Sequence, residues 1–261
     1  MLEKITDFSL ELFSLKGRTA VVTGGNAGLG QAYSLALAKA GANVAVISLA
    51  DDDGETQRLI EECGCQYHFI LADITCDGEP KRAIDKIINR FGRIDILVNN
   101  AGICINEPDV LKFTRSQWDK MLALNLSAAF EMSHETAKYM IPQKSGKIIN
   151  IASMFSYLGG QWSPAYSASK HGIVGLTKAY CDELAQFNIQ VTAIAPGYYA
   201  TPLTEKTRSE PEANQRVLSH IPANRWGNLA DLMGTAVFLA SDASNYVNGS
   251  VIAVDGGYLV R

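Results

Sequence analysis

Short runs of apolar, often β-branched residues alternate along the chain with longer stretches of helical pattern. Runs of this length, bounded by turn residues, are typical of buried strands. Strands that alternate with helices from end to end indicate a parallel sheet covered on both faces. We therefore predict a single α/β domain over residues 1–261. The predicted strands are residues 18–23, 43–48, 66–71, 94–98, 147–152, 189–194 and 250–254.

Helical patterns fill most of the intervals between these runs. One follows the first strand and stops at Gly41, and another runs over residues 80–91 up to a second glycine, a residue that often ends helices. Residues 118–140 are largely helical, but Asn125 inside them predicts a kink or a bound water. Residues 198–222 are polar, hold three prolines and have no clear period, so we predict a mobile segment that could cover a substrate.

A glycine-rich turn joins the first strand to the first helix. Glycines let a backbone approach a ligand closely, and a helix N-terminus presents free N–H groups and a positive dipole. Such a turn suits the pyrophosphate of a dinucleotide. A plain strand-to-helix turn is the alternative, because a glycine pattern alone is weak evidence. The candidate cofactor residues in this turn are Gly24, Asn26, Gly28, Leu29 and Gly30.

The end of the second strand bears on the choice of cofactor. Ser48 stands where an acidic residue commonly selects NAD. No arginine or lysine follows closely to pair with a 2′-phosphate, and the acidic run 51–53 would repel one. We therefore predict NAD rather than NADP, although an acidic run is also typical of a solvated turn. Asp73, at the end of the third strand, is predicted either to accept from the adenine amino group or to cap the next helix.

The stretch 147–170 holds the candidate chemistry. Ser153 stands where a buried strand ends, and Pro164 is typical of the first turn of a helix. Tyr166 and Lys170 are four positions apart on that helix, so they project from one face. A cation beside a phenol lowers the phenol pKa from its usual value near ~10. Tyr166 could then exchange a proton with a carbinol or ketone oxygen, whereas an ordinary surface helix is the alternative.

Composition narrows the classes of function. The 261 residues carry a formal net charge of −4 with both signs mixed, so we predict no nucleic-acid or membrane partner. The first residues lack the apolar core of a secretory signal, and no apolar run could span a bilayer. Five cysteines without framework spacing predict free thiols in a reducing cytoplasm. No histidine or cysteine cluster predicts a metal site.

Together these motifs resemble those of the short-chain dehydrogenase/reductase family. The resemblance covers nearly the whole chain and implies a Rossmann-like, three-layer α/β fold with a seven-stranded parallel sheet. It implies Tyr166 as catalytic acid and base, with Lys170 tuning its pKa and binding the cofactor ribose. It implies Ser153 as donor to the substrate oxygen and Asn125 as anchor of a proton-relay water. The quoted motifs are Thr23-Gly-Gly-Asn-Ala-Gly-Leu-Gly30, Asn99-Asn-Ala-Gly102, Asn125, Ser153, Tyr166-x-x-x-Lys170 and Pro196-Gly197 with Thr201. Further cofactor contacts are implied at Ser48, Asp73, Ile74, Asn100, Ala101, Gly102, Pro196, Gly197 and Thr201.

A narrower similarity is to the bacterial members of this family that act on sugar acids, carried among others by residues 221–227 and 253–261. It implies an NAD(H)-dependent oxidoreductase acting on a keto-deoxygluconate or a ketogluconate. That branch usually carries arginine after the Asn-Asn-Ala-Gly motif, where Ile105 and Asn106 stand here. A neutral ketose or polyol therefore stays open as the substrate, because a buried carboxylate without a cation is costly. A 3-oxoacyl-carrier-protein reductase and a dinucleotide-binding sensor are further alternatives.

The resemblance also implies the walls of the substrate pocket and an assembly. The pocket is expected over Ser153 and Tyr166, between residues 154–163 and 198–222, where Arg208 could supply the missing cation. A homotetramer is implied, in which the helices that hold Asn125 and Tyr166 pack across a twofold axis. The predicted substrate contacts are Ser153, Gln161, Trp162, Tyr198 and Asn106.

Overall fold

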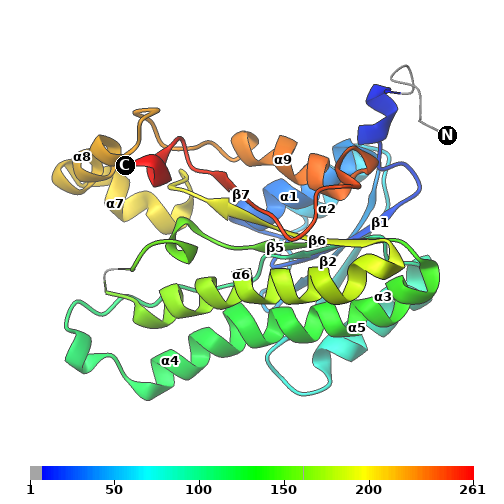
Figure 1. Ribbon diagram of the computed structural model, residues 1–261, viewed down its shortest axis with the longest axis horizontal. Coiled ribbons are helices and arrows are strands. Elements are labelled where there is room, and N and C mark those ends of the chain that lie inside the picture. Colours follow the sequence, from blue (N-terminus) through cyan, green and yellow to red (C-terminus); the bar gives the residue numbers. More distant parts are fainter. Residues whose placement is uncertain (1–7, 161) are drawn as a thin grey trace.

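All seven predicted strands are present in the computed structural model, which describes residues 8–160 and 162–261. They form one parallel sheet in the order β3-β2-β1-β4-β5-β6-β7, so the predicted Rossmann-like three-layer fold is confirmed (Figure 1). The strands are β1 Thr19–Thr23, β2 Asn43–Ser48, β3 Tyr67–Leu71, β4 Ile96–Asn99, β5 Gly146–Ile151, β6 Ile189–Pro196 and β7 Val251–Val254.

Helices cover both faces of the sheet (Figure 1). The α1, α2 and α9 helices pack on one face, and α3, α5 and α6 pack on the other. The α7 and α8 helices stand beyond the carboxyl ends of the strands. The helices are α1 Gly28–Lys39, α2 Glu55–Glu61, α3 Glu79–Phe91, α4 Arg115–Leu122, α5 Ala128–Gln143, α6 Pro164–Leu184, α7 Glu205–Ser209, α8 Pro211–His220 and α9 Ala230–Ala240. Among the described residues, no helix is both long and apolar enough to cross a membrane.

Burial on both faces explains why the strands read as unbroken apolar runs. Every residue of β1, β4, β5 and β6 is buried. Neighbouring side chains of β5 point to opposite layers, so Ile148 packs with α3 and α5 while Ile149 packs with α1 and α9. Each such side chain, when fully buried, contributes about 1.5–3 kcal/mol to the free energy of unfolding, relative to an exposed one.

A buried polar network ties the central strands to the helices below them. The side-chain amide of Asn99, on β4, donates to the Ser133 hydroxyl at 2.9 Å and to the Asn150 side chain at 2.8 Å. The Asn150 amide in turn donates to the Thr177 hydroxyl at 3.0 Å. These bonds join β4 and β5 to α5 and α6, so they hold α6 in position along the sheet.

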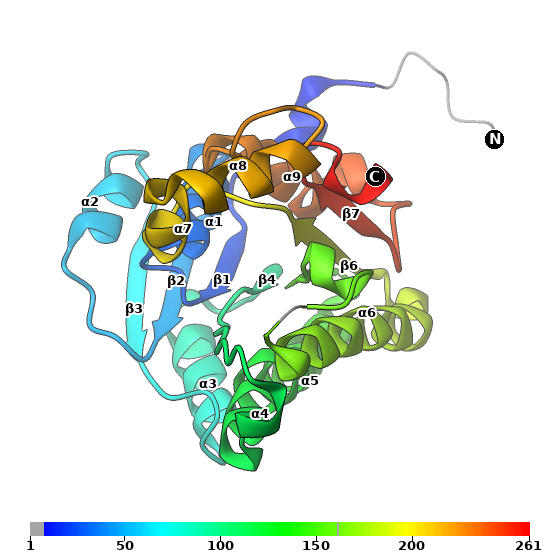
Figure 2. The same ribbon diagram turned by 90° about the vertical axis from the view of Figure 1, so that its left-hand side faces the viewer.

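The strand order reverses between β1 and β4, which are adjacent although β2 and β3 separate them in sequence. Val22 of β1 pairs in register with Val98 of β4, so the two strands end at the same edge. Connections leave in opposite directions there and open a crevice outside the carboxyl ends of the strands. Figure 2 looks onto this edge, with α7 and α8 on one side of it and α4 on the other.

The helical stretch is irregular around Asn125, where the sequence predicts a kink or a bound water. Between α4 and α5 the chain forms a π-helical segment, η4 Ala123–Ser127, and Asn125 is buried at its centre. A π-helical bulge of this kind often lies at a functional site. The widened turn redirects the Asn125 side chain without ending the helix.

Most of residues 198–222, where the sequence shows no clear period and a mobile segment is predicted, is helical. It holds the 3₁₀ turn η7 Pro202–Thr204 together with α7 and α8. These helices are too short to show a clear period, and Pro211 acts as the first residue of α8 rather than as a breaker.

Tyr33 and Tyr199 form a matched pair for testing the core, since both rings are buried in one apolar cluster. The Tyr33 hydroxyl has no hydrogen-bond partner among residues 8–160 and 162–261. The Tyr199 hydroxyl donates to the carbonyl oxygen of Val254 at 2.8 Å. That carbonyl also accepts from Gly197 at 3.1 Å and would stay bonded without Tyr199.

We expect Tyr33→Phe to leave the free energy of unfolding unchanged or to raise it by about 1 kcal/mol, because the variant removes an unpaired buried hydroxyl. Tyr199→Phe should lower it by about 1 kcal/mol through the loss of one hydrogen bond. Thermal unfolding of the three proteins measures both effects. Equal destabilisation by the two variants would contradict this account of Tyr33.

Candidate active site

The glycine-rich turn after β1 is tightly packed on its inner side and open on its outer side. A Cβ atom on Gly30 would lie 2.0 Å from the carbonyl oxygen of Gly24, so no side chain fits there. Gly28 has a φ of +53°, and a Cβ atom there would meet nothing within 4 Å. Ala27, which precedes α1, gives the helix no side-chain cap. The N–H groups of the first turn of α1 are therefore available, which suits a pyrophosphate.

Asn100 holds the end of β4 against this turn. Its backbone N–H and that of Ala101 both donate to the Thr23 hydroxyl at 3.0 Å. Its side-chain amide donates to the carbonyl oxygens of Thr23 at 2.9 Å and Gly24 at 3.3 Å. The glycine turn and the Asn-Asn-Ala-Gly motif thus meet at the point where the strand order reverses.

The residues after β2 use their side chains to hold neighbouring loops. Asn26 of the glycine turn donates to the carbonyl oxygen of Ala50 at 3.2 Å, and the Ser48 hydroxyl accepts from the Ala50 N–H at 3.3 Å. Asp52 turns inward and accepts from the Tyr67 hydroxyl at 2.8 Å. Only the outer members of the acidic run 51–53 are therefore exposed beside the predicted adenosine position.

Ser153 lies at the end of β5, where the 3₁₀ turn η5 Met154–Ser156 begins. Its hydroxyl accepts from the Phe155 N–H at 3.2 Å. The Ser156 hydroxyl donates to the carbonyl oxygen of Lys170 at 2.7 Å. The loop is therefore fastened to α6 beside the predicted catalytic residues, which holds Ser153 next to them.

Tyr166 lies in the first turn of α6, because Pro164 begins that helix. Burial raises the pKa of its phenol to about 12, and hydrogen bonding to Ser153 opposes the shift. The Lys170 Nζ lies 5.7 Å from the centroid of the Tyr166 ring and donates to the Ile151 carbonyl at 2.6 Å, and the lowering of the phenol pKa by Lys170 stays a prediction. Burial lowers the Lys170 pKa to about 8. Burial therefore pushes both groups toward their neutral forms.

Asn125 holds the loop that follows β4 through two hydrogen bonds to its backbone. Its Oδ1 accepts from the Ile103 N–H at 2.9 Å, and its Nδ2 donates to the Ile103 carbonyl at 2.9 Å. The same Nδ2 donates to the Ser169 hydroxyl at 3.2 Å. A Cβ atom on Gly102 would lie 3.2 Å from Oδ1, so glycine permits this close approach. The side chain joins the loop to α6, and the water-anchoring role implied for Asn125 stays a prediction.

Cys104 is a site residue that the sequence analysis missed. Its thiol is partly buried and lies 3.4 Å from the Asn106 side-chain oxygen and 3.7 Å from the Ser163 hydroxyl. Burial raises the thiol pKa, while hydrogen bonding to Ser163 and the charge of Lys170 act in the opposite sense. Cys104 also adds to the raised pKa of Tyr166. Its position two residues after the Asn-Asn-Ala-Gly motif was the signal available in the sequence.

Tyr198 begins an aromatic wall, by which we mean Tyr198, His220, Trp226 and Tyr258. The Tyr198 ring centroid lies 5.5 Å from those of both Trp226 and Tyr258, and Tyr258 stacks on His220 at 5.9 Å. Tyr198 also contributes to the raised pKa of Tyr166. The aromatic wall therefore joins Tyr198, which influences Tyr166, to His220 on α8.

The other predicted substrate contacts lie on two loops beside the site or outside the described residues. Trp162 is 45% exposed, and its carbonyl accepts from the Glu107 N–H at 2.8 Å. Asn106 lies beside Cys104, as noted, and Gln161 falls outside the residues that the structure describes. The loop after β4 and the loop before α6 therefore meet through backbone as well as side-chain contacts.

Asp73 makes a local turn, and Ile74 beside it is buried. The Asp73 carboxylate accepts from the Thr75 hydroxyl at 2.6 Å and from its N–H at 2.9 Å, and these bonds lower the Asp73 pKa. The residue before α3 is Gly78, so Asp73 does not cap that helix. Its role toward adenine stays a prediction.

The predicted nicotinamide side of the site is built at the end of β6. Pro196 is the last residue of that strand, and a Cβ atom on Gly197 would lie 2.7 Å from the Asp255 Cα, so only glycine fits. Thr201 precedes η7, and its carbonyl oxygen accepts from the Arg208 guanidinium at 3.2 Å. The turn that follows β6 is thereby fixed to α7.

The assembled groups suit proton transfer to or from a substrate oxygen. Tyr166 and Ser153 present hydroxyls at the same place, and Lys170 offers an ammonium close by. No side chain here can carry a hydride, so oxidation or reduction needs a cofactor, for which the glycine turn provides a fitting cradle. Within residues 8–160 and 162–261, no group of three histidine, cysteine or acidic residues is placed to hold a metal ion.

Comparisons with known proteins agree with this geometry. A family model described as "Enoyl-(Acyl carrier protein) reductase" matches residues 24–259. The chain is 64% identical over 261 residues to the uncharacterized oxidoreductase YgcW of Escherichia coli strain K12, covering 100% of this chain and 99% of that one. It is 47% identical to the 2-dehydro-3-deoxy-D-gluconate 5-dehydrogenase of the same strain, over 97% of this chain and 99% of that one.

A solved structure extends the similarity to three dimensions. The gluconate 5-dehydrogenase of Burkholderia cenocepacia J2315, in complex with NADP and tartrate, superposes with a TM-score of 0.90. It is 35% identical in sequence, and the match covers 97% of this chain and 100% of that one. A nicotinamide dinucleotide is therefore the appropriate probe for the crevice described above.

The lowered pKa of Lys170 predicts how dinucleotide binding depends on pH. In the free protein Lys170 loses its charge as the pH rises through about 8. If binding uses the charged form, the Kd for NADH should rise about tenfold between pH 7 and pH 9. In Lys170→Met we expect weaker binding throughout and no such rise. Quenching of protein fluorescence by NADH measures both.

Lys147 provides a matched control for this experiment. It is also buried, and burial lowers its pKa to about 8, but it lies at the opposite end of β5. Lys147→Met should therefore keep the pH dependence of NADH binding. A flat profile for the wild-type protein, or the same slope in Lys170→Met, would remove Lys170 from cofactor binding.

Proposed function

We propose that this chain, which belongs to the short-chain dehydrogenase/reductase family, is an NAD(H)-dependent oxidoreductase that acts on a secondary alcohol or ketone of a sugar acid. Its activity as an oxidoreductase of this family follows from the family match and from the full-length similarity to a sugar-acid dehydrogenase. The finer choices are a keto-deoxygluconate or ketogluconate as substrate and NAD as cofactor. The observation that carries the proposal is the joining of Ser153, Tyr166 and Lys170 at the end of β5.

The chain's own residues manage the proton. When bound, the nicotinamide supplies or accepts the hydride. Tyr166 donates its phenolic proton to the ketone oxygen in the reductive direction and takes it back in the oxidative one. Ser153 donates a hydrogen bond to the same oxygen and holds it beside the phenol. Lys170, once its ammonium reaches the phenol, would stabilise phenolate and thereby bring the pKa of Tyr166 down from about 12.

A neutral ketose or polyol is the second candidate substrate. The observation in its favour is the absence of arginine at Ile105 and Asn106, the loop next to Cys104. A 3-oxoacyl-carrier-protein reductase is less favoured, because the sequence shows no basic block for an acidic carrier. We also propose a cytoplasmic location, since all five cysteines are free thiols.

A substrate panel tests the function. We expect NAD⁺ reduction with 2-dehydro-3-deoxy-D-gluconate, whose hydroxyl is oxidised, or NADH oxidation with 5-keto-D-gluconate, each followed by absorbance. Tyr166→Phe should lower kcat by about 10²–10⁴-fold, because it removes the proton donor and keeps the ring. Tyr246→Phe, at a fully exposed tyrosine, is the control and should retain activity. A wild-type enzyme that reduces neutral ketoses and ignores both keto acids would decide for the second candidate.

The preference for NAD rests on the end of β2. Residues 48–57 hold no arginine or lysine, and Asp51 and Asp53 are exposed there. Arg58 on α2, the next cation along the chain, pairs with Glu62 at 2.6 Å. A 2′-phosphate would meet negative charge and no basic partner. The Burkholderia relative was solved with NADP, so the choice needs a direct measurement.

We expect the Kd for NADH to be lower than that for NADPH by about tenfold or more, since one missing charge-assisted hydrogen bond is worth about 1.5–3 kcal/mol. Leu49, 72% exposed directly after Ser48, offers a position for gain of function. Leu49→Arg should lower the Kd for NADPH, and Leu111→Arg, at a 92% exposed site on another loop, should not. Tighter binding of NADPH by the wild-type protein would overturn the preference.

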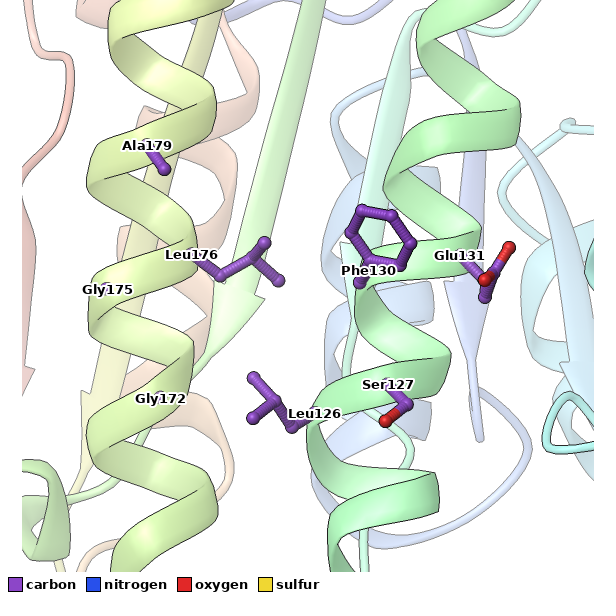
Figure 3. Close-up of a pocket in the computed structure, with 8 residues that line it drawn as sticks. All are labelled: Leu126, Ser127, Phe130, Glu131, Gly172, Gly175, Leu176 and Ala179. Carbon is purple, nitrogen blue, oxygen red and sulfur yellow. The ribbon is translucent and has the colours of Figure 1, made fainter.

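The proposed homotetramer is supported by an apolar groove between α5 and α6. Figure 3 shows Leu126, Phe130 and Leu176 pointing into it from the two helices. The groove has a volume of about 550 Å³, and Phe130 is 41% exposed. Gly175 lines it, and a Cβ atom there would meet nothing within 4 Å. An exposed apolar face with small residues suits close packing of the same helices from a second copy.

Gly175→Glu tests this interface, because the substitution fits the single chain but adds a charge to the proposed contact. We expect the wild-type protein to sediment as a tetramer and the variant as a smaller species with a similar circular dichroism spectrum. Leu111→Glu, at an exposed site away from the groove, should stay tetrameric. A wild-type monomer at micromolar concentration would contradict the proposal.

A further inference from the structure

Two arginines in the helical segment over the site have no acidic partner. Across residues 8–160 and 162–261, no carboxylate pairs with Arg208 on α7 or Arg216 on α8 within 4 Å. By contrast, Arg225, just beyond this segment, pairs with Asp231 at 2.6 Å. A planar guanidinium without a partner is well suited to receive a carboxylate through two parallel hydrogen bonds.

Arg208 is already committed to a structural contact. Its Nη2 donates to the carbonyl oxygen of Thr201 at 3.2 Å, and its Nε is buried. This bond holds α7 against the turn after β6, on the predicted nicotinamide side of the site. Moving Arg208 to a substrate would break that contact, so we do not assign it the missing positive charge.

Arg216 is free of such contacts and lies beside the aromatic wall. It is four residues before His220 on α8, so the two side chains share one side of that helix. His220 stacks on Tyr258 at 5.9 Å, and Tyr258 lies 5.5 Å from Tyr198. The contacts of the wall thus direct this side of α8 toward Tyr198.

The positive charge of Arg216 interacts with Tyr198 of the aromatic wall. Burial raises the pKa of Tyr198 to about 12, and the neighbouring Tyr258 adds to the rise, whereas Arg216 acts in the opposite sense. Tyr198 in turn contributes to the raised pKa of Tyr166. Tyr198 is therefore close enough to interact electrostatically with both Arg216 and Tyr166.

We propose that Arg216 is a specificity-determining residue that receives the carboxylate of a sugar-acid substrate along the aromatic wall. It supplies from α8 the positive charge that Ile105 and Asn106 cannot supply from the loop after β4. This inference rests on the proposed function, since it assumes that the reacting ketone belongs to an acid. The carboxylate lies remote from the reacting carbon, so its loss should act mainly on KM.

The test compares two substrates that differ only at one end. They are 5-keto-D-gluconate and the ketose that carries CH₂OH in place of the carboxylate. The selectivity, kcat/KM for the acid over kcat/KM for the ketose, should fall about tenfold or more in Arg216→Gln. Arg216→Lys should recover part of this selectivity, because lysine keeps the positive charge but cannot make the two parallel hydrogen bonds of a guanidinium. Lys206→Gln removes an exposed charge from α7 and should leave the selectivity unchanged.

Inhibition by tartrate supplies a readout separate from turnover of the acid. With the ketose as substrate, the inhibition constant of tartrate should rise in Arg216→Gln by a similar factor and stay constant in Lys206→Gln. If the wild-type enzyme reduces the acid but neither selectivity nor tartrate inhibition responds to Arg216, this inference fails and the proposed function stands. If the wild-type enzyme reduces the ketose and not the acid, the proposed function fails and this inference fails with it.

Discussion

The reversal of strand order between β1 and β4 is the constraint on which the rest of the structure depends. The connections that follow these two strands leave in opposite directions. No connection therefore crosses the carboxyl ends of β1 and β4, and this edge stays open to a ligand. The glycine turn and the Asn-Asn-Ala-Gly motif follow these two strands, and Asn100 ties them together through Thr23. The cofactor cradle is therefore a consequence of topology, and the glycines adapt it to close packing.

Burial shifts the pKa values of Tyr166 and Lys170, the two residues proposed to handle the proton. Burial raises the pKa of Tyr166 to about 12 and lowers that of Lys170 to about 8, so burial acts against the charged form of each group. The Lys170 ammonium donates to the Ile151 carbonyl, which holds it at the strand end, 5.7 Å from the centroid of the Tyr166 ring. A small movement of this ammonium toward Tyr166 in a low-dielectric site would change the phenol pKa strongly. Such perturbed groups are typical of functional sites.

The sequence predicted the parts of the molecule that local pattern controls. The apolar runs located all seven strands, and the spacing of Tyr166 and Lys170 placed both on one helix. It could not predict contacts between distant segments, such as Asp52 with Tyr67 or Cys104 with Ser163. Pattern also failed over residues 198–222, because two helices of one to three turns show too few positions for a period. Contacts between residues that are far apart in the sequence depend on the fold, so local sequence pattern cannot predict them.

The substrate side of the site is built apart from the sheet. The hydroxyls proposed for catalysis and the glycine turn proposed for the cofactor lie on strand ends and on α6, which the buried polar network of Asn99 and Asn150 holds in place. The aromatic wall instead joins the segment after β6 to the C-terminal residues, and Arg261 donates to the Ser219 carbonyl of α8. Changes in this wall can alter which substrate fits without moving Tyr166 or the glycine turn. A charge on α8, as proposed for Arg216, would therefore alter the preference for an acid without any change in the core.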